Sequence, residues 1–136
     1  MTAPVILALP TDDRVRAHAF YCDGLGFAAV GEPAEDGVPE PLQVVVTDGL
    51  HLMFIPRGGF GWVTGDHDVA SPGVSECLLG LSADTDAEVD TVFARAETAG
   101  AAVVTRPAAP PWGGYTATFA DPDGHLWQVG TQPGQS

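Results

Sequence analysis

The stretch PWGGYTATFADPDGHLWQV, residues Pro111–Val129, carries the clearest structural signal in the chain. Tyr115–Ala120 and His125–Val129 are rich in the aromatic and β-branched residues that are typical of strands. The sequence DPDG at 121–124 lies between them, and its proline, aspartates and glycine are the residues that tight turns favour. The stretch therefore predicts a β-hairpin.

A helix and two strands are predicted upstream of this hairpin. Thr85 followed three residues later by Glu88 forms a capping box, which marks a helix start. The apolar residues that follow at helical spacing are Val89, Val92, Phe93 and Ala96. Gly100 is expected to end the helix, because glycine favours the position after the last turn. Val74–Leu81 and Ala101–Thr105 are strand-like and complete this half.

The first half of the chain predicts the same order of elements. Thr11 and Asp12 are candidate caps for a helix that runs to Cys22 and stops at Gly24 or Gly26. The predicted strands are Pro4–Leu9, Phe27–Val30, Leu42–Val46 and Leu50–Ile55. The Asp-Gly pair between the last two strands indicates a second hairpin.

The two halves thus resemble a duplication. Three residues of the first half have counterparts in the second: Asp13 with Asp86, Phe20 with Phe93, and Gly26 with Gly100. The sequence predicts one domain over residues 1–136, with modules at about 1–56 and 73–131. The glycine-rich segment 57–72 between them has no periodicity and is expected to be a linker or a mobile flap.

The amino-acid composition limits the classes of molecule that the protein is expected to bind. The 18 acidic residues outnumber the 5 basic ones, and the formal net charge is -13. Such a field repels nucleic acid and anionic lipid and attracts cations, although an acidic surface can also serve solubility alone. Cys22 and Cys77 lie far apart in sequence, and no signal peptide or membrane span is recognisable, so we expect a cytoplasmic protein.

The segment AFYCDGLGF (Ala19–Phe27) resembles the helix-to-strand signature of the vicinal oxygen chelate superfamily, and Pro111–Val129 is similar to the end of that superfamily's second module. The resemblance implies an α+β, glyoxalase-like fold in which two βαβββ modules form a half-barrel cleft, often within a homodimer. Members include glyoxalase I, extradiol dioxygenases, fosfomycin-modifying enzymes and drug-sequestering resistance proteins. The fold therefore does not decide the function.

Enzymes of this superfamily hold a divalent metal with His and Glu side chains. The resemblance places the corresponding positions on Ile6, on or near His51, on Cys77 with Glu76 beside it, and on Gln128. Isoleucine has no donor atom, and a neutral amide is a poor ligand for these metals. We therefore expect neither a metal nor another cofactor, unless the alignment slips so that Glu76 faces inward.

Several polar and aromatic side chains are candidates for ligand binding. The predicted binding residues are His51, Cys77 and Gln128 on the cleft walls, Trp62, Trp112 and Tyr115 at its rim, and Phe60 and Met53. His51 is either a polar anchor or a hydrogen-bonded wall residue, and Cys77 either a nucleophile or an inert thiol. The aromatic rings lie in glycine-rich loops, where a ligand, a dimer partner or the core could cover them.

These observations predict metal-independent binding of a small aromatic or cationic organic molecule, as in the drug-sequestering, bleomycin-resistance-like members. The alternative is a glyoxalase-like lyase, isomerase or dioxygenase that acts on a small molecule in the same cleft. The alternating pattern of the last strand also predicts that Trp127 packs against helices while Gln128 faces the other way.

Overall fold

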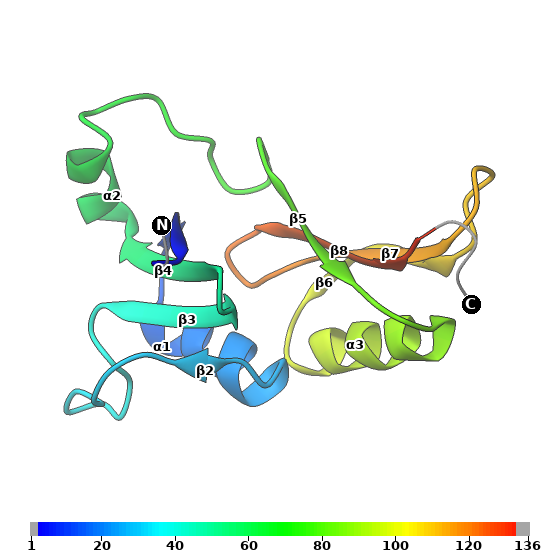
Figure 1. The fold of residues 1–136 in the computed structure, drawn as a ribbon. Coiled ribbons are helices and arrows are strands. Elements are labelled where there is room, and N and C mark those ends of the chain that lie inside the picture. The colour runs from blue at the N-terminus through cyan, green and yellow to red at the C-terminus, as the bar shows by residue number, and fades with distance from the viewer. Residues whose placement is uncertain (1–2, 133–136) are drawn as a thin grey trace. The chain divides into compact units, whose positions relative to one another are not determined.

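Two four-stranded β-sheets form the framework of the molecule, one in each half of the chain (Figure 1). The structure is a computed structural model that describes residues 3–132. The chain divides into two compact units, Met1–Val69 and Ala70–Ser136, and the division falls inside the segment 57–72. Each unit has the order strand, helix, three strands, which confirms the predicted α+β fold of two βαβββ modules.

The first sheet has the strand order β1-β4-β3-β2. Its strands are β1 (Val5–Thr11), β2 (Ala28–Ala29), β3 (Leu42–Thr47) and β4 (Leu50–Pro56). β1 runs parallel to β4, whereas β3 is antiparallel to both of its neighbours. The predicted hairpin between β3 and β4 is therefore confirmed.

The residue that caps the first helix comes directly after the two predicted caps. α1 (Arg14–His18) is capped by Asp13, whose carboxylate accepts a hydrogen bond from the Arg16 backbone N–H at 3.1 Å. The prediction that Thr11 or Asp12 caps the helix was wrong, because β1 continues through Thr11. The Thr11 hydroxyl instead accepts a hydrogen bond from the Asp13 backbone N–H at 3.2 Å.

A π-helix, η1 (Ala19–Gly24), follows α1 directly. Its wider turn is closed by the Leu25 backbone N–H, which donates to the Phe20 carbonyl at 3.0 Å. Phe20 and Tyr21 are both buried, with ring centroids 4.9 Å apart, and Tyr21 also packs on Phe54 of β4. These two adjacent aromatic residues thus join the helical segment to the sheet.

The second sheet has the order β5-β8-β7-β6, again with one parallel pair, β5 with β8. Its strands are β5 (Leu78–Ser82), β6 (Ala102–Ala108), β7 (Tyr115–Ala120) and β8 (Leu126–Thr131). α3 (Asp86–Thr98) covers one face. The Thr85 hydroxyl accepts a hydrogen bond from the Glu88 backbone N–H at 3.1 Å, as the capping box predicted.

An aromatic stack forms the core of the second unit. Trp127 of β8 stacks on Phe119 of β7 with ring planes 7° apart, and Phe119 meets Phe93 of α3 edge-on. Val89 and Ala96 of α3 are buried with them. The prediction that Trp127 packs toward the helix is confirmed.

The connecting region differs from the sequence interpretation in two ways. β5 begins at Leu78 rather than at Val74, because pairing with β8 starts at Leu126, and Val74 instead closes a turn by donating to the Ser71 carbonyl at 2.9 Å. The segment 57–72 also begins with a helix, α2 (Arg57–Val63), despite its glycines. Contacts with β1 and β4, and an ion pair of 2.9 Å between Arg57 and Asp12, offset the low helix propensity.

No helix within residues 3–132 is long and apolar enough to cross a membrane. Cys22 and Cys77 are both free thiols.

Candidate functional site

The first sheet has one face packed on α1 and η1 and another that points away from them, which we call the distal face. Leu52 and Phe54 of β4 are buried on the helix side, whereas His51 and Met53, which alternate with them, are half-buried on the distal face. The parallel register with β1 places Ile6 directly beside His51. Strand alternation thus assembles a mostly apolar surface around one imidazole.

Gln43 of β3 adds a second polar group to the distal face. Its amide nitrogen Nε2 lies 2.8 Å from Nδ1 of His51, within hydrogen-bond distance. In the antiparallel register Gln43 is opposite Met53 and Val45 is opposite His51, so the hydrogen bond crosses diagonally between the strands. Both side chains are partly buried, and the pair therefore fixes the orientation of the ring.

The second sheet has an equivalent face that points away from α3. Gln128 of β8 lies there, half-buried, with Gly80 beside it on β5 and Thr118 opposite it on β7. A Cβ atom added at Gly80 would have no described heavy atom within 4 Å. Space is thus available next to the Gln128 amide.

Tyr115 alternates with the residues of that face and lies on the same side of β7 as Phe119. Its hydroxyl donates a 2.7 Å hydrogen bond to the Asp90 carboxylate of α3. This bond to a carboxylate raises the pKa of Tyr115 above its usual range. Tyr115 is therefore engaged with the helix, and the structure does not bring it together with Gln128.

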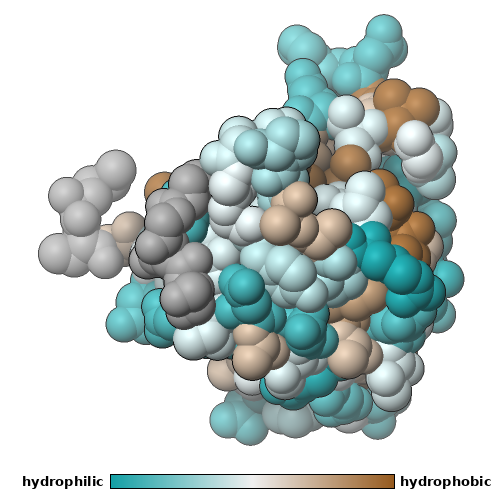
Figure 2. Space-filling view, turned by 90° about the vertical axis from the view of Figure 1, so that its right-hand side faces the viewer, coloured by the Kyte–Doolittle hydropathy of each residue, from teal (hydrophilic) through white to brown (hydrophobic). Residues whose placement is uncertain are grey.

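The remaining candidates occupy loops and the short helix. Trp62 in α2 is 86% exposed and Trp112 in the turn before β7 is 78% exposed, whereas Phe60 is half-buried. Cys77 is exposed and precedes β5 rather than lying in it. Brown areas in Figure 2 show that apolar side chains reach the surface among hydrophilic ones.

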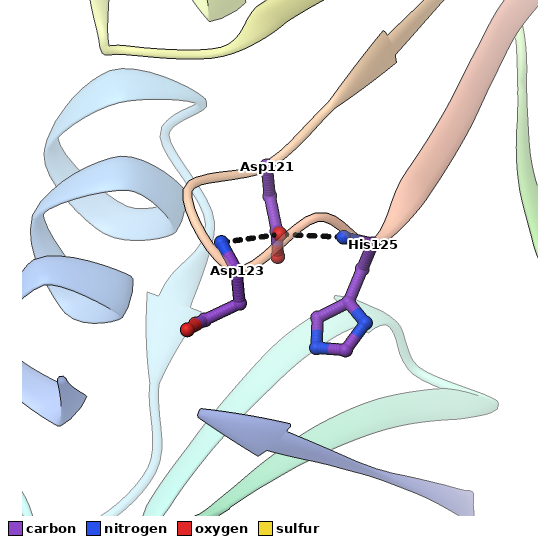
Figure 3. A group of neighbouring side chains, drawn as sticks. All are labelled: Asp121, Asp123 and His125. Carbon is purple, nitrogen blue, oxygen red and sulfur yellow. Dashed lines mark hydrogen bonds between the residues drawn. The ribbon is translucent and has the colours of Figure 1, made fainter. Parts of the chain in front are cut away.

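The DPDG turn holds the one group of three potential metal ligands found within residues 3–132: Asp121, Asp123 and His125. One ligand atom from each lies within 4.8 Å of the others. The Asp121 carboxylate, however, accepts hydrogen bonds from the backbone N–H groups of Asp123 and His125, at 2.9 and 2.8 Å (Figure 3). It thereby stabilises the turn between β7 and β8, which is a structural role.

Comparison with known proteins places this geometry in a family. Residues 4–129 match the model of the Glyoxalase/Bleomycin resistance protein/Dioxygenase superfamily. The chain belongs to this superfamily. No curated protein matches the chain.

Three solved structures are similar to this chain along nearly its whole length. A glyoxalase-related enzyme from Fulvimarina pelagi is 25% identical, with a TM-score of 0.80 over 97% of this chain and 89% of that one. Protein ATC0852 from Agrobacterium tumefaciens is 30% identical, with a TM-score of 0.70 and coverages of 98% and 100%. TnmS3, an antibiotic binding protein from Streptomyces sp. CB03234, is 27% identical, with a TM-score of 0.63 and coverages of 98% and 97%.

The metal-ligand positions that the superfamily resemblance implies are poorly suited to a divalent ion here. Ile6 lies beside His51 but has no donor atom, and Nδ1 of His51 already contacts the Gln43 amide. Gln128 offers only a neutral amide. Ile6 and Gln128 therefore do not supply the His and Glu donors of the metal centre in the superfamily's enzymes.

Gln43 is the site residue that the sequence interpretation missed. It is the one polar residue within the apolar run 42–46, and a polar residue in such a run is a signal for a functional or hydrogen-bonded position. Pairing β3 and β4 around the Asp-Gly turn would not have found its partner, because a register shift between Val45 and Thr47 is needed before Gln43 lies diagonally from His51.

Proposed function

We propose that this protein reversibly binds a small aromatic or cationic organic molecule without a metal ion, as a drug-sequestering member of its superfamily. The observation that carries the proposal is the Gln43–His51 pair, held at 2.8 Å on a face that is otherwise lined by Ile6 and Met53. An apolar surface with a few fixed polar groups is the usual chemistry of a small-molecule site.

The structural likeness supports this choice. TnmS3 is described as an antibiotic binding protein, and the match spans 98% of this chain and 97% of that one. Neither Ile6 nor Gln128 provides a good metal ligand, which also supports binding without a metal ion. The metal is the Lewis acid in the superfamily's metal-dependent enzymes.

Charge and aromatic rings suggest the chemistry of the ligand. Trp62 and Trp112 are exposed indoles that can stack on flat rings, and the net charge of -13 favours a ligand that carries a positive group. Contact with the face of an indole ring also stabilises a bound cation.

The test is a binding screen with chemical recovery of the ligand. Planar antibiotics and dyes, with and without a positive charge, are titrated while tryptophan fluorescence and the heat of binding are measured. We expect members that bind at micromolar or better affinity and return unchanged after release. Elemental analysis of protein purified without a histidine tag should show far less than one transition metal per chain. A silent panel, or one equivalent of bound metal, would refute the proposal.

The alternative is an enzyme of the same superfamily, favoured by the likeness to the glyoxalase-related enzyme from Fulvimarina pelagi. The same screen distinguishes the two, because an enzyme would return a transformed compound with turnover.

We propose further that the protein is a cytoplasmic homodimer. β1 and β5 are edge strands of their sheets and carry exposed apolar residues, among them Val5 at 65% and Leu78 at 52%. Exposed apolar edges are often covered by a second copy.

A further inference from the structure

The contact between Gln43 and His51 assigns the tautomer of the neutral imidazole. The atom of Gln43 that faces the ring is its amide nitrogen Nε2, 2.8 Å from Nδ1 of His51. An amide nitrogen donates hydrogen bonds and does not accept them, so Nδ1 must be the acceptor. The ring proton of the neutral tautomer is then on Nε2.

Nε2 of His51 is free to act on another molecule. Among residues 3–132, none forms a hydrogen bond with this atom. The two ring nitrogens point in different directions, so engagement of Nδ1 by Gln43 leaves the Nε2–H directed elsewhere. A half-buried N–H without a protein partner favours a ligand that can accept its hydrogen bond.

We infer that Gln43 holds His51 as a hydrogen-bond donor that selects planar aromatic ligands bearing an acceptor oxygen, such as a ring carbonyl or a phenolate. This inference rests on the proposed function and names the ligand class for the distal face. Ile6, Val45 and Met53 surround the pair and offer apolar contact to the rest of the ring system.

The assignment also excludes some chemical groups from the position next to His51. An ammonium group would meet an N–H with no lone pair to offer, so the positive part of a cationic ligand must lie away from His51. A metal ion would need a lone pair on Nε2, which requires the proton to move to Nδ1 and the Gln43 amide to turn its oxygen toward the ring. Gln43 is thus a positioning residue that acts through His51.

The first test reads the tautomer directly. Nitrogen-15 spectra of the histidine rings, recorded at mildly alkaline pH, distinguish a protonated Nε2 from a protonated Nδ1, and His51→Phe assigns the His51 signals by their loss. We expect a protonated Nε2 in the unmodified protein and a protonated Nδ1 in Gln43→Glu, because a carboxylate can only accept. His18, His67 and His125 are internal controls and should not change. A protonated Nδ1 in the unmodified protein would overturn the assignment.

The second test uses fluorenone and fluorene, flat ring systems that differ in one carbonyl group. The unmodified protein should bind fluorenone roughly 3- to 10-fold more tightly than fluorene, the range that one net hydrogen bond provides. Gln43→Glu and His51→Phe should each remove this preference. Equal affinities in the unmodified protein would overturn the selectivity and leave the binding function standing. If neither these compounds nor the dyes of the wider panel bind, the binding function itself fails, while the tautomer spectra still decide the role of Gln43.

Discussion

Ile6 and His51 are direct partners in the parallel register of β1 and β4, and both lie on the distal face of the first sheet. Side chains that are paired in this way lie close enough to share a ligand. One substitution in β1 should therefore create a metal site that the natural sequence does not provide.

We predict that Ile6→His confers measurable Zn²⁺ or Ni²⁺ binding, because it places a second imidazole next to His51. Metal binding should then move the His51 ring proton to Nδ1, where the Gln43 amide can accept its hydrogen bond by turning its oxygen toward the ring. Calorimetric titration should show at least a tenfold increase in affinity over the unmodified protein. Val5→His is the matched control, since the neighbouring position points to the other face of β1. Equal affinity in both variants would contradict the register.

Two glycines of the second sheet should respond differently to the same change. A Cβ at Gly130 would lie 2.6 Å from Cγ2 of Thr116, whereas one at Gly80 would have no described neighbour within 4 Å. Gly130→Ala should lower the free energy of unfolding by about 1–3 kcal/mol through overpacking, and Gly80→Ala should leave it nearly unchanged. Urea denaturation measures both, and adding Thr116→Ala should restore part of the loss in Gly130→Ala. Equal effects of the two alanines would refute this packing.

Tyr115 should make stability depend on alkaline pH. Its hydrogen bond to the Asp90 carboxylate raises its pKa above the usual value of 10.0. The protonated phenol is therefore favoured by folding, and this contribution is fully present below the usual pKa and lost as pH rises through the raised one. Tyr115→Phe should flatten that alkaline decline, measured by urea denaturation across a pH series. An unchanged decline would show that the hydrogen bond contributes nothing in solution.

The fold could be predicted because its signals are local. Thr85 and Glu88 are close in sequence and need only each other to mark a helix start, and Trp127 needs only strand alternation to reveal its buried side. The end of β1 and the start of α1 compete for the segment 11–13, and only pairing with β4 shows that Thr11 belongs to the strand. α2 likewise depends on contacts with β1 and β4 that its glycine-rich sequence does not reveal.

The candidate site was harder to predict because it depends on pairing between strands. His51 and Met53 could be selected from β4 alone, but Gln43 becomes relevant only when β3 is placed beside them. Tyr115 was chosen as an aromatic residue near glycines, and its partner Asp90 is on α3, 25 residues away in sequence. Exposed Trp62 and Trp112 stay predictions, since exposure alone does not distinguish a ligand surface from an interface.

The homodimer can be tested through its edge strands. Light scattering at micromolar concentration should give the mass of two chains. Val5→Lys on β1 and Leu78→Lys on β5 place charges on exposed edges and should shift the equilibrium toward one chain. Glu97→Lys on α3, which removes only an exposed ion pair with Arg106 of β6, is a charge control that should not. The mass of one chain for the unmodified protein would reject the dimer and leave the fold intact.

The exposed indoles provide the last prediction. If Trp62 or Trp112 anchors the ligand, its replacement by alanine should weaken binding by about 1–3 kcal/mol. Since both rings are largely exposed, the free energy of unfolding should change by no more than about 0.5 kcal/mol. Val63→Ala, an exposed apolar change next to Trp62, is the matched control and should leave affinity unaltered.

A salt series distinguishes the electrostatic contribution to this binding from the stacking contribution. The net charge of -13 should speed the association of cationic dyes at low ionic strength, and added salt should slow it, whereas the stacking contribution should persist. Stopped-flow fluorescence over a salt series measures the association rate, and calorimetry measures the affinity that remains. Because an uncharged dye feels no such field, its association rate should not change with salt. If both alanine variants bind every dye as tightly as the unmodified protein, the ring of the ligand does not rest on either indole, and the distal faces of the sheets must supply the apolar contact.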